Sequence, residues 1–212
     1  MILPGLGKKG SVEPLNVSPA ALRQMHKEGK LAVLAEFIPQ YLGLEPASPQ
    51  LEPYWALAEE LDIPVGIHMG PGPRGAAYRG FSEYRMRLSN PLLLEDVLLR
   101  HPKLRVYICH AGWPFIDELV ALLYAHPQVY VDIAVINWVL PEAEFQAYLR
   151  RIVDAGFSQR VMFGSDNMLR PDSIDLAVAR TSAPFLSDDQ KRDILCRNAA
   201  RFLRLGDDVC RL

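Results

Sequence analysis

Residues 101–115 read HPKLRVYICHAGWPF, and this stretch decides the fold that the sequence predicts. Its apolar part, residues 104–109, has the length of a β-strand and is followed at once by His110. Two other apolar stretches end in the same way, one on His68 and one on the segment Gly-Ser-Asp-Asn at 164–167. Three chemically active side chains therefore follow successive strands, at the edge where α/β barrels hold their catalytic residues.

The stretches around these strands alternate in character along the whole chain. Strand-like apolar runs occupy residues 31–37, 65–68, 104–109, 129–135 and 160–164, and residues 1–6 could form one more strand. Helical spacing covers residues 18–30, 51–61, 90–100, 114–125, 141–156 and 187–205. Ser18-Pro19 has the residues of a helix start, and residues 187–190 (SDDQ) have those of a capping box. Strands that alternate with helices predict a parallel sheet with right-handed crossovers.

Two α/β architectures fit this alternation, a barrel and an open doubly wound sheet. The open sheet usually carries a glycine-rich phosphate loop after an early strand. The chain offers only Gly-Pro-Gly-Pro at residues 70–73, and its prolines lack the backbone donors that a phosphate needs. We therefore predict an α/β fold of the TIM-barrel type.

Composition bounds the class of protein. The chain has 212 residues, which suits a single domain over 1–212, and a formal net charge of -2, which predicts no binding to nucleic acid or to an anionic membrane. Its apolar runs are too short to span a bilayer, and its first residues lack the apolar region of a signal peptide. We expect a cytoplasmic protein. Cys109, Cys196 and Cys210 lack the spacing of a metal finger and are expected to be reduced thiols.

Five strings together resemble one family. They are LDIPVGIHMGPGP, HPKLRVYICHAGWPF, HPQVYVDIAV, RVMFGSDNM and NAARFLRL. Their order and spacing are similar to the metal-dependent amidohydrolase superfamily, in particular to its aminocarboxymuconate-semialdehyde decarboxylase-like branch, often called amidohydrolase 2. The likeness runs from about residue 18 to about residue 205. It implies a (β/α)8 barrel with one or two divalent metal ions at the carboxyl ends of the strands.

The resemblance also implies roles for single residues. His68 matches the histidine after the family's fifth strand, which is a metal ligand. His110 matches the histidine after the sixth strand, which serves as a metal ligand or as a catalytic acid and base. Asp166 matches the aspartate after the eighth strand, which binds metal and takes a proton from the attacking water. Glu36 ends the fourth strand, where some relatives hold a bridging carboxylate or a modified lysine.

One departure concerns the start of the family pattern. The family carries a His-x-His pair at the end of its first strand, and the early histidine of this chain, His26, has no such partner. Counting back from the eighth strand, the chain begins at about the third, so roughly six of the eight strands are expected. We therefore expect an incomplete barrel, either because the sequence is an N-terminally truncated family member or because another chain supplies the rest.

Several other side chains are candidates for substrate binding. Trp113 and Trp138 follow strand ends and could wall a pocket, although tryptophans also fill cores. The segment 69–89 is long for a strand-to-helix connection, which indicates a functional loop. Arg74 in this loop could clamp a substrate carboxylate, or it could be a solvated surface charge. The same alternatives hold for the loop's other arginines, which are Arg79, Arg85 and Arg87.

Three functions follow as hypotheses. The first is a metal-dependent hydrolase that acts on a small carbonyl, ester or amide-like substrate with zinc, or else manganese, as its cofactor. The second is a metal-dependent, non-oxidative decarboxylase of a small unsaturated or aromatic acid. The third is an inactive fragment or a subunit that pairs through open barrel edges, for example as a homo-oligomer.

Overall fold

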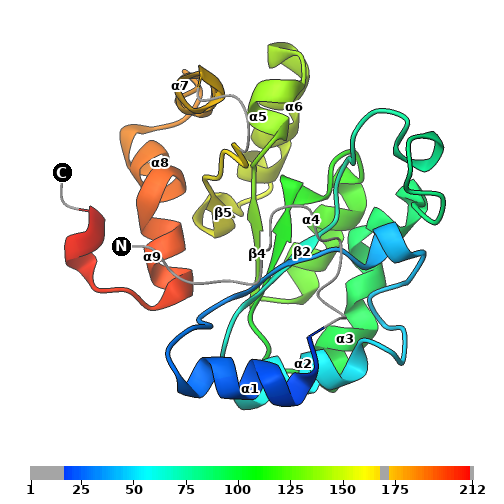
Figure 1. Ribbon diagram of the computed structural model, residues 1–212. Helices are drawn as coiled ribbons and strands as arrows, with labels where there is room; N and C mark the ends of the chain where they lie inside the picture. Colours follow the sequence, from blue (N-terminus) through cyan, green and yellow to red (C-terminus); the bar gives the residue numbers. More distant parts are fainter. Residues whose placement is uncertain (1–16, 168–171, 211–212) are drawn as a thin grey trace. The chain divides into compact units, whose positions relative to one another are not determined.

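The structure is a computed structural model that describes residues 17–167 and 172–210 (Figure 1). Its contacts group the chain into two compact units, residues 1–129 and residues 130–212, and each is described by itself. The strand considered for residues 1–6 lies outside the described residues.

The first unit is built on three parallel strands, β1 (Leu34–Phe37), β2 (Val65–His68) and β3 (Val106–Cys109). The pairing of β2 with β3 runs without a break from Val65 opposite Val106 to His68 opposite Cys109. All four residues of β2 are buried, as expected for a strand that is covered on both faces. The predicted strands at 31–37, 65–68 and 104–109 are confirmed, with shorter bounds for the first and the last.

A glycine fixes how β2 and β3 fit together. Gly66 lies opposite Tyr107, and a Cβ atom on Gly66 would come within 2.3 Å of the Tyr107 ring. The tyrosine ring therefore occupies the space that a side chain on Gly66 would need. Since β2 ends on His68 and β3 ends just before His110, this fit also sets the positions of both histidines along their strands.

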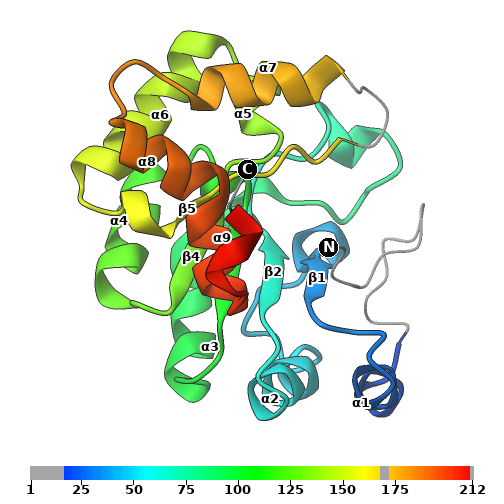
Figure 2. The same ribbon diagram turned by 90° about the vertical axis from the view of Figure 1, so that its left-hand side faces the viewer.

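Helices join these strands. They are α1 (Pro19–Lys27), α2 (Glu52–Glu60), α3 (Glu95–Arg100) and α4 (Ile116–Ala125), and Figures 1 and 2 both show α1, α2 and α3 at the lower end of this unit. The predicted cap of α1 is confirmed, because the Ser18 side chain accepts a hydrogen bond from the backbone of Ala21 at 3.2 Å. The helix predicted over 90–100 begins instead with a 3-10 turn, η5 (Pro91–Leu94), where Asn90 caps the backbone of Leu92.

The second unit holds β4 (Val129–Asp132), apart from its first residue, and β5 (Val161–Met162), which pair in parallel. Its helices are α5 (Ile136–Val139), α6 (Glu142–Asp154), α7 (Asp172–Thr181), α8 (Asp188–Arg192) and α9 (Asn198–Leu203). The capping box predicted at 187–190 is confirmed, with Ser187 and Gln190 bonding each other's backbone. A π-helical segment, η8 (Asp193–Arg197), joins α8 to α9, so the predicted continuous helix is irregular in its middle.

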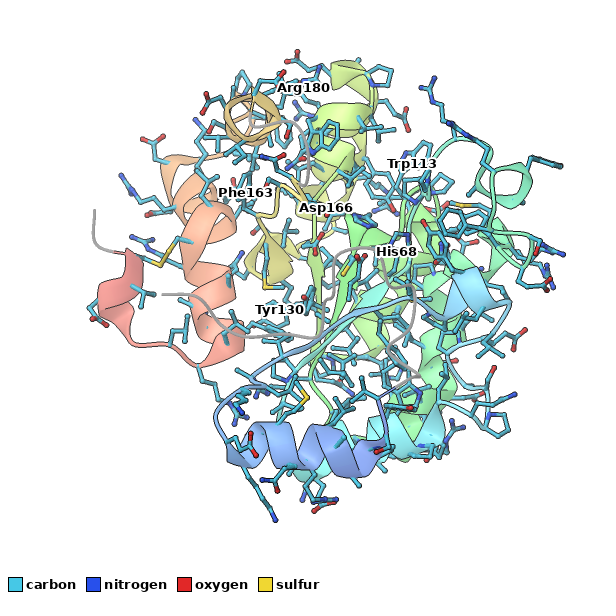
Figure 3. The ribbon with its side chains drawn as sticks, in the orientation of Figure 1. His68, Trp113, Tyr130, Phe163, Asp166 and Arg180 are labelled. Atoms are coloured by element: carbon cyan, nitrogen blue, oxygen red, sulfur yellow. A yellow bond between two sulfur atoms is a disulfide. The ribbon has the colours of Figure 1, made fainter. Side chains whose placement is uncertain are left out.

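The cysteine prediction is wrong for two of the three residues. Cys196 in η8 and Cys210 form a disulfide, visible as a sulfur–sulfur bond in Figure 3. Cys109 is a buried thiol outside this disulfide, as predicted. Spacing alone could not reveal the bond, because the pairing depends on the turn after α9 that brings the two cysteines within 5.9 Å of each other at their Cα atoms. Among the described helices, none is long and apolar enough to cross a membrane.

Candidate active site

Three strand ends of the first unit bring together the side chains that the sequence singled out there. Glu36 is the third residue of β1, His68 is the last residue of β2, and His110 follows β3 directly. Because the three strands are parallel, their carboxyl ends meet at one edge of the sheet. Among the described residues, Glu36, His68 and His110 form the one group of three side chains arranged to hold a metal ion.

The three side chains contact one another directly. The Nδ1 atom of His68 donates to Oε1 of Glu36 at 2.6 Å, and Nε2 of His110 lies 3.3 Å from the same oxygen. The two imidazole nitrogens are 3.2 Å apart, and the ring centroids are 4.5 Å apart. Exposure is 8% for the His68 side chain and 3% for His110, against 37% for Glu36. The carboxylate is thus the group of this cluster that solvent reaches.

Electrostatics keeps Glu36 ionised. Burial by itself would raise the pKa of this carboxyl, because less water is available to stabilise its charge. Hydrogen bonds from His110 and His68, together with their charges, outweigh the burial and hold the pKa of Glu36 far below its ordinary value. The cluster therefore presents an anion beside two imidazoles over the whole physiological pH range.

These donors fit a divalent metal ion. Imidazole nitrogen and carboxylate oxygen are both common zinc ligands, bound at about 2.0–2.2 Å, which places tetrahedral ligand atoms about 3.4 Å from each other. The candidate ligand atoms already lie within 4.8 Å of one another, and their separations of 2.6, 3.2 and 3.3 Å need only a small opening. Three protein ligands with one position left for water or substrate is the usual arrangement of a catalytic zinc site.

Close backbone packing holds His110 in place. A Cβ atom on Gly70 would come within 2.5 Å of the His110 Cβ, so only glycine permits the segment after β2 to pass this closely. His110 itself has a φ of 61°, in the left-handed region that non-glycine residues rarely adopt. Such a conformation persists where the surroundings enforce it, which is common at functional sites.

Aromatic side chains next to His68 were missed by the sequence reasoning. The edge of the Tyr41 ring packs against His68 with the centroids 5.3 Å apart, and Phe81 and Tyr84 each lie 5.0 Å from Tyr41. Two of these rings come from the long segment 69–89, which supports its interpretation as a functional loop. The available signal was the three aromatic residues within 78–84, which are Tyr78, Phe81 and Tyr84.

A buried polar pair also ties this loop to the end of β2. Gln40 and Ser89 are fully buried, and the Ser89 hydroxyl lies 2.8 Å from the Gln40 amide oxygen. The amide nitrogen of Gln40 donates to the carbonyl of Gly70 at 3.2 Å. The two ends of the loop are thus connected beside the cluster of Glu36, His68 and His110.

The candidates for substrate binding in this unit have different surroundings. Trp113 is half-buried, and its backbone N–H donates to the carbonyl of His110 at 3.1 Å. Arg74, Arg79, Arg85 and Arg87 are all exposed, and Arg85 donates to carbonyls of its own loop. Exposure fits the solvated alternative for these arginines as well as a clamp that forms around a substrate.

Asp166 belongs to the second unit, where it follows β5 and is half-buried (Figure 3). It has a φ of 47°, again in the left-handed region. β5 ends at Met162, earlier than predicted, and the carbonyls of Gly164 and Ser165 bond to side chains of α5. The amide of Asn137 donates to the carbonyl of Gly164 at 2.9 Å, and the indole N–H of Trp138 donates to that of Ser165 at 2.7 Å. The structure thus gives Trp138 a hydrogen bond beside Asp166.

The chain is similar to proteins of known sequence and structure. A sequence model of the amidohydrolase family matches residues 6–205. The protein fluG of Emericella nidulans is 21% identical over 144 residues, which cover 68% of this chain and 15% of fluG.

Two solved structures share the fold. An uncharacterized TIM-barrel protein of Bordetella bronchiseptica has a TM-score of 0.68 at 20% identity, with 87% of this chain and 61% of that chain covered. A 5-carboxyvanillate decarboxylase of Novosphingobium aromaticivorans, solved with manganese, has a TM-score of 0.63 at 15% identity, with 95% and 64% covered. The chain thus spans less than two thirds of either structure and a small part of fluG. Its fold is α/β of the TIM-barrel type, and its match to the family model covers nearly its whole length: the chain belongs to the amidohydrolase family.

Proposed function

We propose that this chain carries the catalytic site of a metal-dependent hydrolase that acts on a small carbonyl, ester or amide-like substrate. The observation that supports the proposal most is the cluster of Glu36, His68 and His110, in which an ionised carboxylate and two buried imidazoles meet at the carboxyl ends of three parallel strands. Family membership supports it independently, because amidohydrolases hold their metal ions at this edge of the sheet.

In this proposal Glu36, His68 and His110 hold a divalent cation. The cation supplies Lewis-acid polarisation of the substrate carbonyl and lowers the pKa of water. Zinc suits a site of two nitrogen ligands and one oxygen ligand. Manganese is the alternative, since the structurally similar 5-carboxyvanillate decarboxylase contains it.

Two steps of the reaction are assigned to Asp166 and His110. Asp166 accepts the proton of the attacking water and passes it to the leaving group, while His110 stabilises the negative charge that develops on the carbonyl oxygen. Trp113, Trp138 and Arg74 are proposed to contact the substrate, with Arg74 binding a carboxylate where the substrate has one.

The test combines metal analysis with activity. The purified chain is assayed on lactones, esters and amides with zinc or manganese, before and after a chelator, and the same assays are run on Asp166→Asn. We expect about one metal ion per chain and a loss of at least roughly 1000-fold in kcat for the variant. Activity that survives both the chelator and the Asp166→Asn change would sink the proposal.

Decarboxylation is the second candidate, and two observations favour it. The manganese-containing structure that shares the fold is a decarboxylase of an aromatic acid. In addition, Tyr41, Phe81 and Tyr84 pack edge to face next to His68, and they offer aromatic contacts for a planar substrate. Release of carbon dioxide from unsaturated and aromatic acids, without hydrolysis of the ester and amide panel, would select this reaction.

We also propose a cytoplasmic location. The bond between Cys196 and Cys210 would be rare in a reducing compartment, so counting the free thiols of protein taken directly from cells tests this location.

We propose, in addition, that the chain associates with itself. Light scattering of the purified chain is the measurement. A compact monomer would refute it.

A further inference from the structure

Two neighbouring residues of α5 hold the backbone that leads to Asp166. Asn137 and Trp138 each use a side-chain N–H to bind one of two successive carbonyls, those of Gly164 and Ser165, at 2.9 and 2.7 Å. These are the two residues that directly precede Asp166. Fixing both carbonyls restricts the two peptide planes through which the direction of the Asp166 side chain is set.

The helix that provides these two side chains is itself anchored. Arg180 in α7 donates through Nη1 to the carbonyls of Leu140 and Trp138, at 2.9 and 3.2 Å. These carbonyls lie at the end of α5, where a helix leaves its last carbonyls without partners of its own. Figure 3 shows Arg180 on α7 and Asp166 beyond β5. Arg180 thus fixes the short helix from which Asn137 and Trp138 reach the Asp166 segment.

The surroundings of Asn137 indicate that its side chain does more than fill space in the core. Its side chain is fully buried, and its amide oxygen has no hydrogen-bond partner among the described residues. A buried acceptor without a partner reduces stability, so a residue that serves packing alone would be apolar at this position. The polar contact that the side chain does make is the one to Gly164.

The backbone at Gly164 also passes close to Ala134, which lies just before α5. A Cβ atom on Gly164 would come within 2.9 Å of the Ala134 Cβ, so glycine is needed for the carbonyl to come within reach of Asn137. Asp166, two residues later, has its φ of 47°. A residue in this region needs neighbouring contacts that hold it there.

We propose that Asn137 and Trp138 are positioning residues for Asp166. By binding the carbonyls of Gly164 and Ser165 they keep the Asp166 carboxylate in the orientation needed for proton transfer, without touching the substrate through these N–H groups. The inference rests on the proposed function for the catalytic role of Asp166. It also gives Trp138 a role in addition to its proposed substrate contact.

The experiment uses two variants that remove one N–H group each. Asn137→Leu keeps the shape of the buried side chain, and Trp138→Phe keeps an aromatic ring. Trp55→Phe is the matched control, because its indole N–H also bonds a carbonyl, that of Pro46 at 2.8 Å, far along the chain from Asp166. Each protein is measured for amide hydrogen exchange in the peptide that contains residues 163–167, for its melting temperature, and for kcat and KM.

We expect exchange in this peptide to accelerate about 10-fold in both variants and kcat to fall about 10-fold. The KM of Asn137→Leu, which changes no proposed substrate contact, should stay within about 2-fold of the starting value. The melting temperature of Asn137→Leu should stay within about 2 °C or rise, since the orphaned amide oxygen is gone. The Trp55→Phe control should change neither the exchange in this peptide nor kcat.

Three results would overturn the inference. The first is unchanged exchange and unchanged kcat in both variants. The second is a lower melting temperature of Asn137→Leu with unchanged kcat, which is the signature of a purely structural asparagine. The third is full activity of Asp166→Asn. Because exchange is measured without any substrate, faster exchange in that case would locate the failure in the proposed function and not in the backbone contacts.

Discussion

The cluster in the first unit and the Asp166 segment in the second are organised by opposite means. Glu36, His68 and His110 contact one another through their side chains, and the charge of the carboxylate links the two imidazoles. Asp166 is held through its backbone, because Asn137 and Trp138 bind the carbonyls before it. The first arrangement should respond mainly to changes in charge, and the second mainly to changes in hydrogen-bond geometry and space.

The largest effect is expected where the charge of the cluster is removed. Glu36→Gln keeps the shape of the side chain but takes away the anion between two buried imidazoles, so we expect metal affinity to fall roughly 1000-fold, about 4 kcal/mol. Calorimetric titration with zinc and with manganese measures it.

Glu59→Gln is the control for this prediction. Glu59 also bonds a buried histidine, with its Oε2 atom 3.0 Å from Nδ1 of His101. It is not part of the cluster of Glu36, His68 and His110. Its metal affinity should equal that of the starting protein. Equal affinities of Glu36→Gln and Glu59→Gln would show that charge does not organise the cluster.

The next largest effect concerns the second unit alone. The bond between Cys196 and Cys210 spans 14 residues, so its removal by Cys196→Ser with Cys210→Ser should lower the free energy of unfolding by about 3 kcal/mol. Hydrogen exchange resolved along the chain is the measurement. Faster exchange should be confined to residues 130–210, and an equal acceleration in residues 17–129 would contradict the division of the chain into two units.

A smaller effect is expected from a steric change in the segment that leads to Asp166. Gly164→Ala places a methyl group against Ala134, and we expect a loss of about 2 kcal/mol in stability with a fall in kcat. The compensating change Ala134→Gly should restore much of both in the double variant. Chemical denaturation and steady-state kinetics provide the data, and a double variant no better than Gly164→Ala would show that the Ala134 contact is not the cause.

The smallest effect is a pH dependence within the first unit. Burial would raise the pKa of Glu59, but hydrogen bonds from the Lys103 backbone and from His101, and their charges, lower it. A lowered carboxyl pKa stabilises the fold above the unfolded pKa of about 4.3, and this stability is lost as the pH falls. The starting protein should exceed Glu59→Gln by about 1 kcal/mol at pH 7. Urea denaturation from pH 7 to pH 3 should show the gap closing below about pH 4, and a constant gap would refute the assignment.

Sequence patterns predicted the parts of this protein that depend on local order along the chain. The strand at 65–68, the Ser18 cap and the capping box at Ser187 follow from neighbouring residues, and all are confirmed. Glu36, His68 and His110 could be predicted because each lies at or next to the end of a strand, and parallel pairing then brings strand ends together. Contacts between distant segments gave no such pattern. Tyr41 next to His68, Asn137 next to Gly164 and the bond between Cys196 and Cys210 all depend on how loops fold back.

The contact of Tyr107 with Gly66 matters for any transfer of the cluster of Glu36, His68 and His110 to another scaffold. Copying the two histidines alone would leave the register of the two strands undetermined, and a slip by one residue turns each side chain to the opposite face of the sheet. The tyrosine ring fits where a glycine lies opposite it, so this pair favours one register. A graft should therefore carry five residues, which are Glu36, the two histidines, Gly66 and Tyr107.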